Sequence, residues 1–386
     1  MAGDTTKKKI GIIGGGQLGK MMILEAKRLG FYVVTLDPEK SCPSHSISDE
    51  HIIADFNNHH AYVELAKKTD IITYEFEHIH AKVLEELENK GHLIYPSVKS
   101  LKIIQNKFTQ KQELRDNGVP VPKFALVDSL EAIHRLGMQD KFGYPLMIKT
   151  TLGGYDGKGN ALAVTKEDAE GAFILLGSGE HQLMAEEFID FEREISIIAC
   201  RGLDGSRVIY PVAENTHRNS ILDTTIVPAR LSPKIVDNAT KIADKVMEVF
   251  EGVGTFCVEM FVTHDEEVLV NEVAPRPHNS GHYTIEGCFA NQFENHIRAI
   301  TGLPFGYVDL IKPTVMINLL GESDGAAQLE GLEDAYNDPG LHVHLYGKAM
   351  SKKWRKMGHF TVVDDTLDNA LNRANKARAL LKVTGK

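Results

Sequence analysis

Short apolar runs alternate with amphipathic segments in the N-terminal part of the chain. Lys9–Ile13, Tyr32–Leu36 and Ile71–Tyr74 are apolar runs with the length of buried strands. The segments 18–29 and 61–68 between these runs are predicted helices. Because strands that alternate with helices predict a parallel sheet with right-handed crossovers, we expect residues 1–102 to form a Rossmann-like domain.

The β content rises in the rest of the chain. Predicted strands cover 144–149, 161–164, 183–189, 194–200, 207–212, two runs within 255–273, 315–319 and 343–346. Predicted helices cover 234–250 and the C-terminal segment, where one face carries Leu367, Ala370, Leu371, Ala374 and Leu381 at helical spacing. We therefore expect an α/β protein with three domains, 1–102, 103–310 and 311–386.

Composition places the chain among globular proteins and narrows its partners. Of 386 residues, 42% are hydrophobic and 25% are charged, which is ordinary for folded domains. The formal net charge of −10 disfavours nucleic-acid binding, and no apolar run approaches the length of a membrane span. Cys42, Cys200, Cys257 and Cys288 form no CxxC pair, which excludes the usual structural zinc sites and indicates a reducing, cytoplasmic setting.

A glycine motif follows the first predicted strand. Residues 14–19 read Gly-Gly-Gly-Gln-Leu-Gly and match GxGxxG, and Asp37 ends the second strand, where a ribose-binding acid would stand. The motif is compatible with a dinucleotide, with a phosphate on another small substrate, or with glycines needed only for close strand–helix packing.

A second glycine-rich loop, 151–159, lies between two predicted strands and contains Lys158. Glycine amides can turn toward oxyanions and Lys158 adds a positive charge, so we interpret this loop as a phosphate flap. It is not a Walker A loop, because Gly159 follows the lysine and a strand comes next. Lys149 ends the preceding strand, and Lys107 is a further cation upstream.

Two glutamates are predicted to face each other across a hairpin. If the turn is centred between Asp265 and Glu266, Glu259 lies opposite Glu272. Paired carboxylates near phosphates favour Mg²⁺ over a solvated strand face. Asn271 could add an oxygen, although strand alternation places it on the opposite face unless the ladder bends there.

The turn that follows, 271–282, is dense in polar residues and stiffened by two prolines. It presents Arg276, His278 and Asn279, which suit an anionic substrate. By contrast, we interpret the histidines at 59–60, 78–80 and 342–344 as surface residues.

Together these segments resemble the ATP-grasp enzymes. The resemblance rests on Lys149 with the loop 153–159, the strand 186–189, Glu194 and the pair Glu259 and Glu272. The segments 73–78, 271–282 and 346–348 resemble, more closely, the 5-(carboxyamino)imidazole ribonucleotide synthetase family. That family implies an N-terminal pre-ATP-grasp domain, an ATP-grasp domain with residues 123–190 as its lid, and a small β-rich C-terminal domain. It also implies carboxylation of aminoimidazole ribonucleotide by ATP and bicarbonate in purine biosynthesis, with release of ADP and phosphate.

The resemblance implies roles for matching residues. The ATP site would contain Lys107, Lys149, Gly154, Tyr155, Asp156, Gly157, Lys158, Gly159, Asn160, Glu186, Glu187, Phe188, Ile189, Glu194, His217, Asn271 and Glu272. The nucleotide substrate would contact Gln17, Leu18, Glu75, Tyr155, Asp156, Asn279, Lys348, Arg355 and Lys356. The catalytic set would be Arg276, His278, Lys348, Lys149 and Asp156. Mg²⁺ would lie between Glu259 and Glu272.

Within these sets, Gln17 and Leu18 would offer backbone N–H groups to the substrate, Glu75 would hold its ribose, and Arg276, His278 and Lys348 would bind bicarbonate. No NAD and no biotin are expected, and the chain is expected to form a homodimer whose product passes to a mutase. One departure is visible, because residues 351–355 read Ser-Lys-Lys-Trp-Arg where the family pattern has Arg-Pro-Gly-Arg.

Three rival readings stay open at this point. One is another ATP-grasp ligase, such as a formate-dependent glycinamide ribonucleotide transformylase or a biotin-carboxylase-like protein. The second is an NAD-dependent oxidoreductase, which rests on residues 14–19 and Asp37 alone. The third is a nucleotide-sensing module without catalysis.

Overall fold

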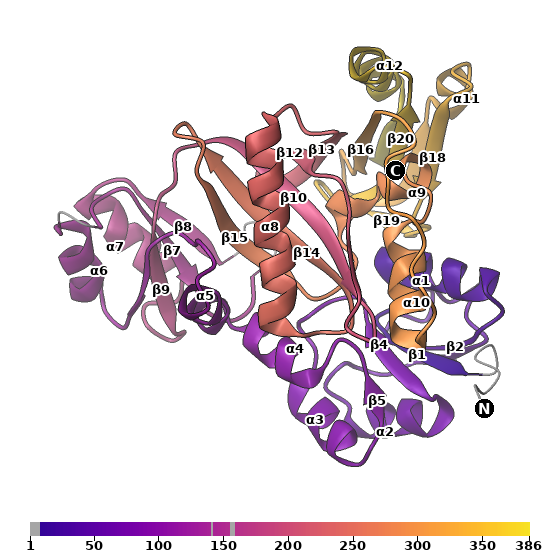
Figure 1. The fold of residues 1–386 in the computed structure, drawn as a ribbon, viewed down its shortest axis with the longest axis horizontal. Helices are drawn as coiled ribbons and strands as arrows, with labels where there is room; N and C mark the ends of the chain where they lie inside the picture. The colour runs from indigo at the N-terminus through magenta and orange to yellow at the C-terminus, as the bar shows by residue number, and fades with distance from the viewer. Residues whose placement is uncertain (1–7, 140–141, 155–158) are drawn as a thin grey trace.

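The N-terminal part of the chain forms a parallel sheet, as predicted. The computed structural model describes residues 8–139, 142–154 and 159–386. Five strands pair in the order β3-β2-β1-β4-β5, all in parallel. Their bounds are β1 Lys9–Ile13, β2 Tyr32–Leu36, β3 Glu50–Ile52, β4 Ile71–Tyr74 and β5 Leu93–Ile94. The helices of this part are α1 Gln17–Arg28, α2 His59–Lys68 and α3 Ala81–Asn89, and Figure 1 shows them around the sheet.

Two helices then lead to a small separate sheet, at the left of Figure 1. The connecting helices are α4 Val98–Gln105 and α5 Lys107–Asp116. The sheet is antiparallel in the order β6-β9-β7-β8, with bounds β6 Phe124–Val127, β7 Leu146–Thr150, β8 Asn160–Ala163 and β9 Leu183–Glu187. Helices α6 Leu130–Gly137 and α7 Lys166–Leu175 cover it through a core that includes Ile133, Ile148 and Ala169. The strand predicted to reach position 189 ends at Glu187, so Phe188 and Ile189 lie beyond it.

A nine-stranded sheet forms the centre of the molecule. Its order is β15-β14-β10-β12-β13-β16-β20-β18, and β11 pairs with β10 outside this path. Its bounds are β10 Phe191–Arg201, β11 Arg207–Ile209, β12 Ala213–Arg218, β13 Ile221–Val227, β14 Gly254–Thr263, β15 Val268–Ala274, β16 Thr314–Leu320, β18 Leu341–Leu345 and β20 Lys356–Val363. Strand β13 lies in the predicted domain 103–310 and β16 in the predicted domain 311–386. Because these two strands pair, the central sheet crosses the predicted boundary at position 311. The three-domain division stays a prediction.

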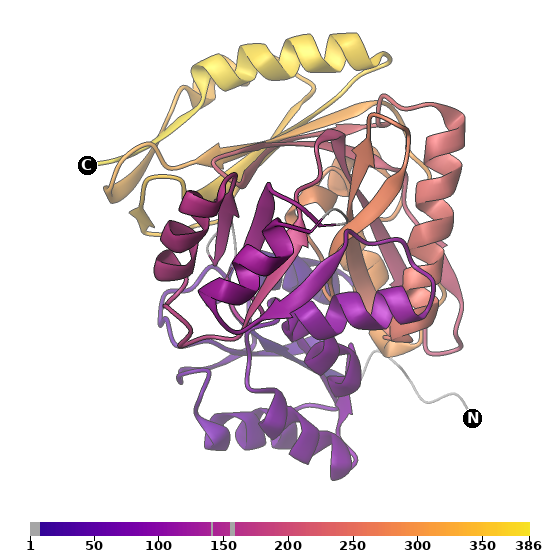
Figure 2. The same ribbon diagram turned by 90° about the vertical axis from the view of Figure 1, so that its left-hand side faces the viewer.

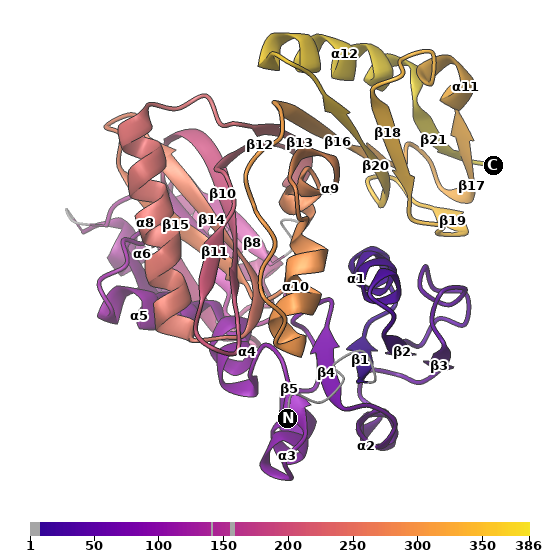
Figure 3. The ribbon, with the colours of Figure 1, turned by 45° about the vertical axis from the view of Figure 1, so that its right-hand side comes forward.

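Helices join the central sheet to its neighbours. Helix α8 (Pro233–Phe250), capped by Ser232, buries Ile235, Ala239 and Val246 against it. Helix α10 (Gln292–Thr301), which follows the short α9 (Thr284–Gly287), packs Phe293 and Ile297 against Leu18 and Met22 of α1. Figure 3 shows α10 between the central sheet and α1.

The C-terminal part adds a second small sheet, in the order β19-β17-β21. Its elements are β17 Gly325–Glu330, α11 Leu332–Ala335, β19 Met350–Ser351, α12 Leu367–Leu380 and β21 Lys382–Gly385. Helix α12 lies over this region in Figure 2 and buries Ala370, Ala374 and Ala377. Leu371 is only half-buried, and Leu381 is buried just after the helix ends, so the predicted apolar face is displaced toward the alanines.

Within the described residues, no helix is long and apolar enough to span a bilayer.

Candidate active site

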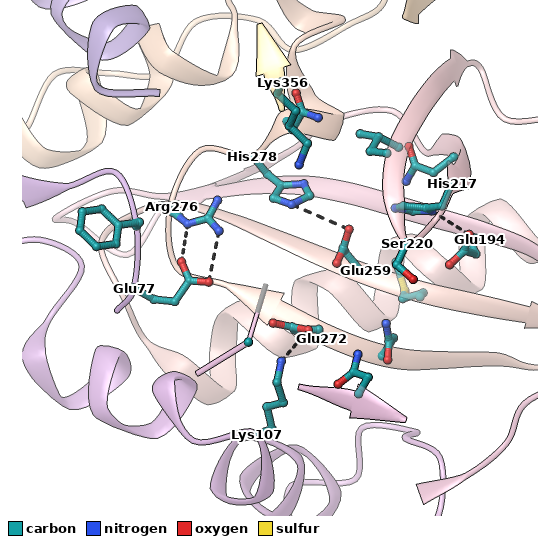
Figure 4. Close-up of a pocket in the computed structure, with 18 of the residues that line it drawn as sticks. Glu77, Lys107, Glu194, His217, Ser220, Glu259, Glu272, Arg276, His278 and Lys356 are labelled. Atoms are coloured by element: carbon teal, nitrogen blue, oxygen red, sulfur yellow. Dashed lines mark hydrogen bonds and ion pairs between the residues drawn. The ribbon is translucent and has the colours of Figure 1, made fainter. Parts of the chain in front are cut away.

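A cavity of about 790 Å³ opens where the N-terminal sheet, the small antiparallel sheet and the central sheet meet. Figure 4 shows charged side chains converging on it from the segment after β4, from α5 and from the central sheet. Of the residues predicted from the sequence, those that line the cavity are Gln17, Leu18, Glu75, Lys107, Gly154, Asn160, Glu194, His217, Glu259, Asn271, Glu272, Arg276, His278, Asn279 and Lys356. The volume is in the range of small-molecule sites.

The two predicted carboxylates face each other. Glu259 on β14 is the direct partner of Glu272 on β15. The turn, however, is one residue tighter than predicted: Thr263 N donates to Glu267 O at 2.9 Å, and Glu266 has φ +61°. A register shift between Glu259 and Met260 then restores the predicted pairing. The prediction was therefore right in its pairing and wrong in its turn.

Asn271 is the extra residue in that register shift. Met260 pairs with Val270 while Glu259 pairs with Glu272, so Asn271 has no partner in the ladder and forms a β-bulge. The bulge turns its side chain to the carboxylate side, where it lines the cavity, and its Oδ1 accepts from Lys149 Nζ at 3.4 Å. The ladder thus bends at the residue where strand alternation alone would have excluded an oxygen from the site.

Negative charge gathers around Glu259. The pKa of Glu259 is raised to about 7, mainly by burial and also by the nearby carboxylates of Glu272 and Glu194, against the opposing effect of His217. The cationic neighbours are His278, whose Nε2 lies 3.8 Å from Glu259, and Lys107, whose Nζ lies 3.2 Å from Glu272. Two opposed carboxylates at the cavity, with an amide oxygen beside them, are a donor set that fits a hard divalent cation such as Mg²⁺.

The raised pKa of Glu259 predicts pH-dependent binding of Mg²⁺. Below about pH 7 the ion must displace a proton from this carboxyl, so its apparent Kd should rise by up to about tenfold per pH unit. Calorimetric titration with MgCl₂ at pH 8 and pH 6 measures this ratio, and the same titration of Glu259→Gln should be weak at both values. Equal affinity of the wild-type protein at both pH values would contradict this assignment.

Lys149 belongs to a buried cluster behind the cavity. Glu186 Oε2 lies 2.7 Å from Lys149 Nζ, and Glu186 Oε1 lies 3.2 Å from Lys111 Nζ. Burial alone would raise the pKa of Glu186, but the two lysines lower it, and burial lowers the pKa of Lys111 to about 8. Glu186 therefore positions Lys149 through its side chain. Lys111 was not among the residues predicted for the site.

Glu194 and His217 form a second pair at the cavity wall. His217 Nδ1 lies 2.7 Å from Glu194 Oε2, and both side chains are about one-quarter exposed. Burial would lower the pKa of His217, but the bonded carboxylate of Glu194 raises it. The pair can offer both a carboxylate and an N–H group to a sugar hydroxyl.

Arg276 is held by Glu77, a residue absent from the predicted site. Arg276 Nε donates to Glu77 Oε2 at 2.5 Å and Nη2 donates to Glu77 Oε1 at 3.2 Å. Although burial alone would raise the pKa of Glu77, the guanidinium lowers it to about 2. Glu77 binds the Nε–Nη2 edge and Nη1 donates to Pro277 O at 3.3 Å, while the guanidinium lines the cavity (Figure 4).

His278 stands next to this guanidinium. Its Nδ1 lies 2.9 Å from Ser280 Oγ. Burial, reinforced by the positive charges of Arg276 and Lys356, lowers the pKa of His278 well below its usual value. A neutral imidazole can donate one hydrogen bond or accept one at the cavity.

Amides of the N-terminal glycine motif are bound by a side chain of the protein itself. Gly16 N donates to Glu75 Oε1 at 2.5 Å and Gly19 N donates to Glu75 Oε2 at 2.6 Å. The carboxylate thus takes amides that a dinucleotide pyrophosphate would need. Burial raises the pKa of Glu75. Gln17 and Leu18 remain at the cavity wall.

Several predicted residues lie away from the cavity wall. Lys348 Nζ donates to Lys356 O at 2.8 Å, Arg355 Nη1 donates to Met350 O at 2.8 Å, and Glu187 pairs with Lys123 at 2.6 Å. Phe188 is exposed, whereas Gly159 and Ile189 are half-buried. Tyr155, Asp156, Gly157 and Lys158 lie outside the described residues.

The histidines interpreted as surface residues include two with further contacts. His78 is exposed, as predicted, and also lines the cavity. His344 is half-buried: it pairs with Glu286 at 2.7 Å and stacks on the buried His359, with ring centroids 4.5 Å apart. The contacts of His344 join segments that are distant in the sequence.

Lys20 is another residue that the sequence did not reveal. Its Nζ donates to Leu345 O at 3.2 Å and Tyr346 O at 3.3 Å, so α1 fixes the loop that carries Lys348. A lysine directly after the glycine motif is visible in the sequence, but its partners are more than three hundred residues away.

Known proteins resemble this chain over most of its length. Family models match as a ribonucleotide synthetase preATP-grasp domain at residues 7–105, an ATP-grasp domain at 112–293 and a phosphoribosylaminoimidazole carboxylase C-terminal domain at 314–373. An N5-carboxyaminoimidazole ribonucleotide synthase from Staphylococcus aureus is 41% identical over 362 residues, which are 93% of each chain.

Solved structures agree with this similarity. The N5-carboxyaminoimidazole ribonucleotide synthetase from Thermotoga maritima is 46% identical, with a TM-score of 0.89 over 98% of this chain and 100% of the other. An N5-carboxyaminoimidazole synthase from Aspergillus clavatus, in complex with ADP and 5-aminoimidazole ribonucleotide, is 34% identical, with a TM-score of 0.89 over 97% of this chain and 99% of the other.

Proposed function

The chain belongs to the N5-carboxyaminoimidazole ribonucleotide synthase family, and from this premise we propose how its own residues carry out the reaction. The reaction is the ATP-dependent carboxylation of 5-aminoimidazole ribonucleotide with bicarbonate in purine biosynthesis, and it forms ADP. A formate-dependent transformylase is not favoured by these relatives.

The observation that carries the assignment of roles is the opposed pair Glu259 and Glu272 at the cavity into which Arg276 points. Mg²⁺ bound by Glu259 and Glu272 would neutralise charge on the ATP phosphates. Lys107 would then exchange its contact with Glu272 for a phosphate oxygen, and Lys149, held by Glu186, would lie at the same phosphates. Asn271 and the flap 154–160 would complete this phosphate side. The segment Glu186–Ile189, at and beyond the end of β9, would bind adenine, and Glu194 with His217 would bind the ribose of ATP.

Bicarbonate binds beside the γ-phosphate in this scheme. The guanidinium of Arg276 and the imidazole of His278 hold it, with Lys348 nearby, so that one of its oxygens attacks the γ-phosphorus as ADP leaves. The resulting carboxyphosphate releases CO₂ and phosphate next to the exocyclic amine of the nucleotide, whose nitrogen then forms the new C–N bond. The enclosing residues exclude water, which would otherwise hydrolyse this mixed anhydride.

The nucleotide substrate occupies the N-terminal side of the cavity. Gln17 and Leu18 offer backbone N–H groups, Asn279 with Tyr155 and Asp156 lies near the imidazole, and Lys348 with Arg355 and Lys356 binds the 5′-phosphate. Glu75 would contact the ribose while its carboxylate accepts hydrogen bonds from the amides of Gly16 and Gly19. Arg355 would have to leave Met350 O to reach that phosphate.

ADP release tests this function directly. Purified protein with Mg·ATP should release ADP rapidly when bicarbonate and 5-aminoimidazole ribonucleotide are both present, and slowly when formate with glycinamide ribonucleotide replaces them. Equal release with the second pair of substrates, or no dependence on the imidazole nucleotide, would contradict it.

Lys348→Ala should weaken binding of the imidazole nucleotide more than binding of ATP. Loss of one cation at a phosphate removes about 1.5–3 kcal/mol of charge-assisted hydrogen bonding, which is roughly a 10- to 150-fold rise in the KM of that nucleotide. Steady-state kinetics with each substrate varied in turn measure the split, and Lys352→Ala, an exposed neighbour on the same segment, is the control. An unchanged KM for the nucleotide would remove Lys348 from the phosphate site.

We further propose a homodimer. Phe289, Tyr307 and Ile311 are 67%, 80% and 47% exposed, and their segments lie side by side because Ala290 N donates to Tyr307 O and Ile311 N donates to Gly287 O. Exposed aromatic residues gathered in this way are typical of protein interfaces. Light scattering should therefore give twice the chain mass for the wild-type protein and the single mass for Tyr307→Glu, with Tyr336→Glu as control; a monomeric wild-type protein would contradict this.

A cytoplasmic location and transfer of the unstable product to a mutase complete the proposal. The four cysteines are free and buried, which supports a reducing setting.

A further inference from the structure

Three side chains that the proposed reaction does not use converge behind the glycine motif. Asp37 directly follows β2, Cys42 lies in the loop that continues from it, and His51 lies on β3. One carboxylate oxygen, the Sγ atom and one ring nitrogen all lie within 4.8 Å of one another. We propose that Asp37, Cys42 and His51 bind one thiophilic divalent ion of the Zn²⁺ class.

The distances suit such an ion. His51 Nε2 lies 3.9 Å from Cys42 Sγ. With metal–sulfur and metal–nitrogen bonds of about 2.3 Å and 2.0 Å, tetrahedral geometry needs these two atoms about 3.5 Å apart, so a small side-chain rotation suffices. Three protein ligands leave a fourth position for water.

The ring nitrogen of His51 that would face away from the ion, Nδ1, has a hydrogen-bond partner, as is usual for metal-binding histidines. His51 Nδ1 lies 3.0 Å from His45 Nδ1, while His51 Nε2 lies 3.1 Å from Asp37 O. A hydrogen bond at the far nitrogen fixes the ring and selects the tautomer. When the ion binds, the thiol proton leaves to solvent and the proton of His51 moves from Nε2 to Nδ1. The proton of His45 moves from Nδ1 to its solvent-side Nε2, so that His45 Nδ1 accepts the hydrogen bond from His51.

The site is enclosed but can be reached. Cys42 and Asp37 are 5% and 8% exposed, whereas His51 is half-buried and His45 is exposed. An ion can therefore enter past the imidazole edges and meet a carboxylate and a sulfur that are shielded from water. Asp37 keeps its carboxylate oriented through Gly15 N and Glu39 N, each at 2.8 Å.

The ion would connect this loop to the substrate side of the active site. Gly15 packs so closely that a Cβ there would lie 2.4 Å from Cys42 Sγ, and Ser44 N donates to Gly15 O at 3.0 Å. Gly15 precedes Gly16, whose amide binds Glu75. Bound metal would thus rigidify the glycine motif and stabilise the folded N-terminal domain.

Cobalt spectroscopy tests the proposal on the untagged full-length protein after removal of metal. One equivalent of Co²⁺ per chain should produce a sulfur-to-cobalt charge-transfer band with the visible bands of a tetrahedral ion, and one equivalent of Zn²⁺ should remove them and raise Tm. Cys42→Ser should abolish the charge-transfer band, and His51→Gln should weaken both sets of bands. Cys288→Ser and His59→Gln are the controls and should leave them unchanged.

Absence of a charge-transfer band in the wild-type protein, or an unchanged band in Cys42→Ser, would overturn the proposal. Circular dichroism verifies that each variant is folded. ADP release with Mg²⁺, measured on the same wild-type preparation, keeps this result separate from the proposed function, because an active enzyme without the cobalt band refutes only the metal site.

Discussion

Glu272→Gln should lower kcat by about 10²–10³-fold while the protein stays folded, because the substitution removes charge that the phosphoryl transition state needs from its counterion site. Glu272 is the cross-strand partner of Glu259 and contacts Lys107. The amide has nearly the same shape but cannot neutralise a divalent cation. Coupled measurement of ADP release at saturating substrates, with Mg²⁺ varied, gives the size of the loss.

Glu267→Gln is the matched control, since this exposed glutamate lies in the turn of the same hairpin. It should retain wild-type kcat. Wild-type ADP release from Glu272→Gln would exclude Glu272 from the metal site, whereas loss of the folded circular dichroism spectrum would show a structural role instead.

Arg276→Met should destabilise the protein by about 3–5 kcal/mol as well as abolish turnover, because it leaves the Glu77 carboxylate buried without its partner. The two side chains are only 15% and 13% exposed, and they join the central sheet to the segment after β4. Urea unfolding measures the loss. The double variant Arg276→Met/Glu77→Gln removes both charges and should recover most of the stability without recovering activity.

The same pair predicts the acid side of the stability curve. The pKa of Glu77 is lowered from 4.5 to about 2, so its stabilisation is complete above about pH 4.5 and is lost as the pH falls toward 2. In Arg276→Met this part of the acid-induced loss should disappear. Equal unfolding free energies for the single and double variants would show that the ion pair contributes little.

The Glu259–Glu272 hairpin shows what the local hydrophobic pattern can predict and what it cannot. Two apolar runs separated by a polar turn were enough to place the carboxylates opposite each other. The one-residue error in the turn was cancelled by the bulge at Asn271, and neither feature has a strong local signal. Bulges are stabilised by what packs and bonds around them, here Lys149, so they are difficult to predict from one strand.

The glycine motif shows the opposite case. Its sequence was compatible with several anions, and in the structure the carboxylate of Glu75 binds two of its amides. A residue some sixty positions away thus occupies N–H groups that an external anion would need, because the same N–H groups cannot serve two anions at once.

The sequence by itself determined the parallel N-terminal sheet, the β-rich remainder, the opposed glutamates and the family, since these follow from periodicity and from contiguous motifs. Tertiary structure alone decided that Glu77 aims Arg276, that Glu186 holds Lys149 together with Lys111, and that Lys20 fixes the loop carrying Lys348. Each of these contacts joins residues far apart in the chain. Their pairing depends on how whole elements pack. The local sequence around a charged residue does not indicate which distant residue will become its partner in the folded protein.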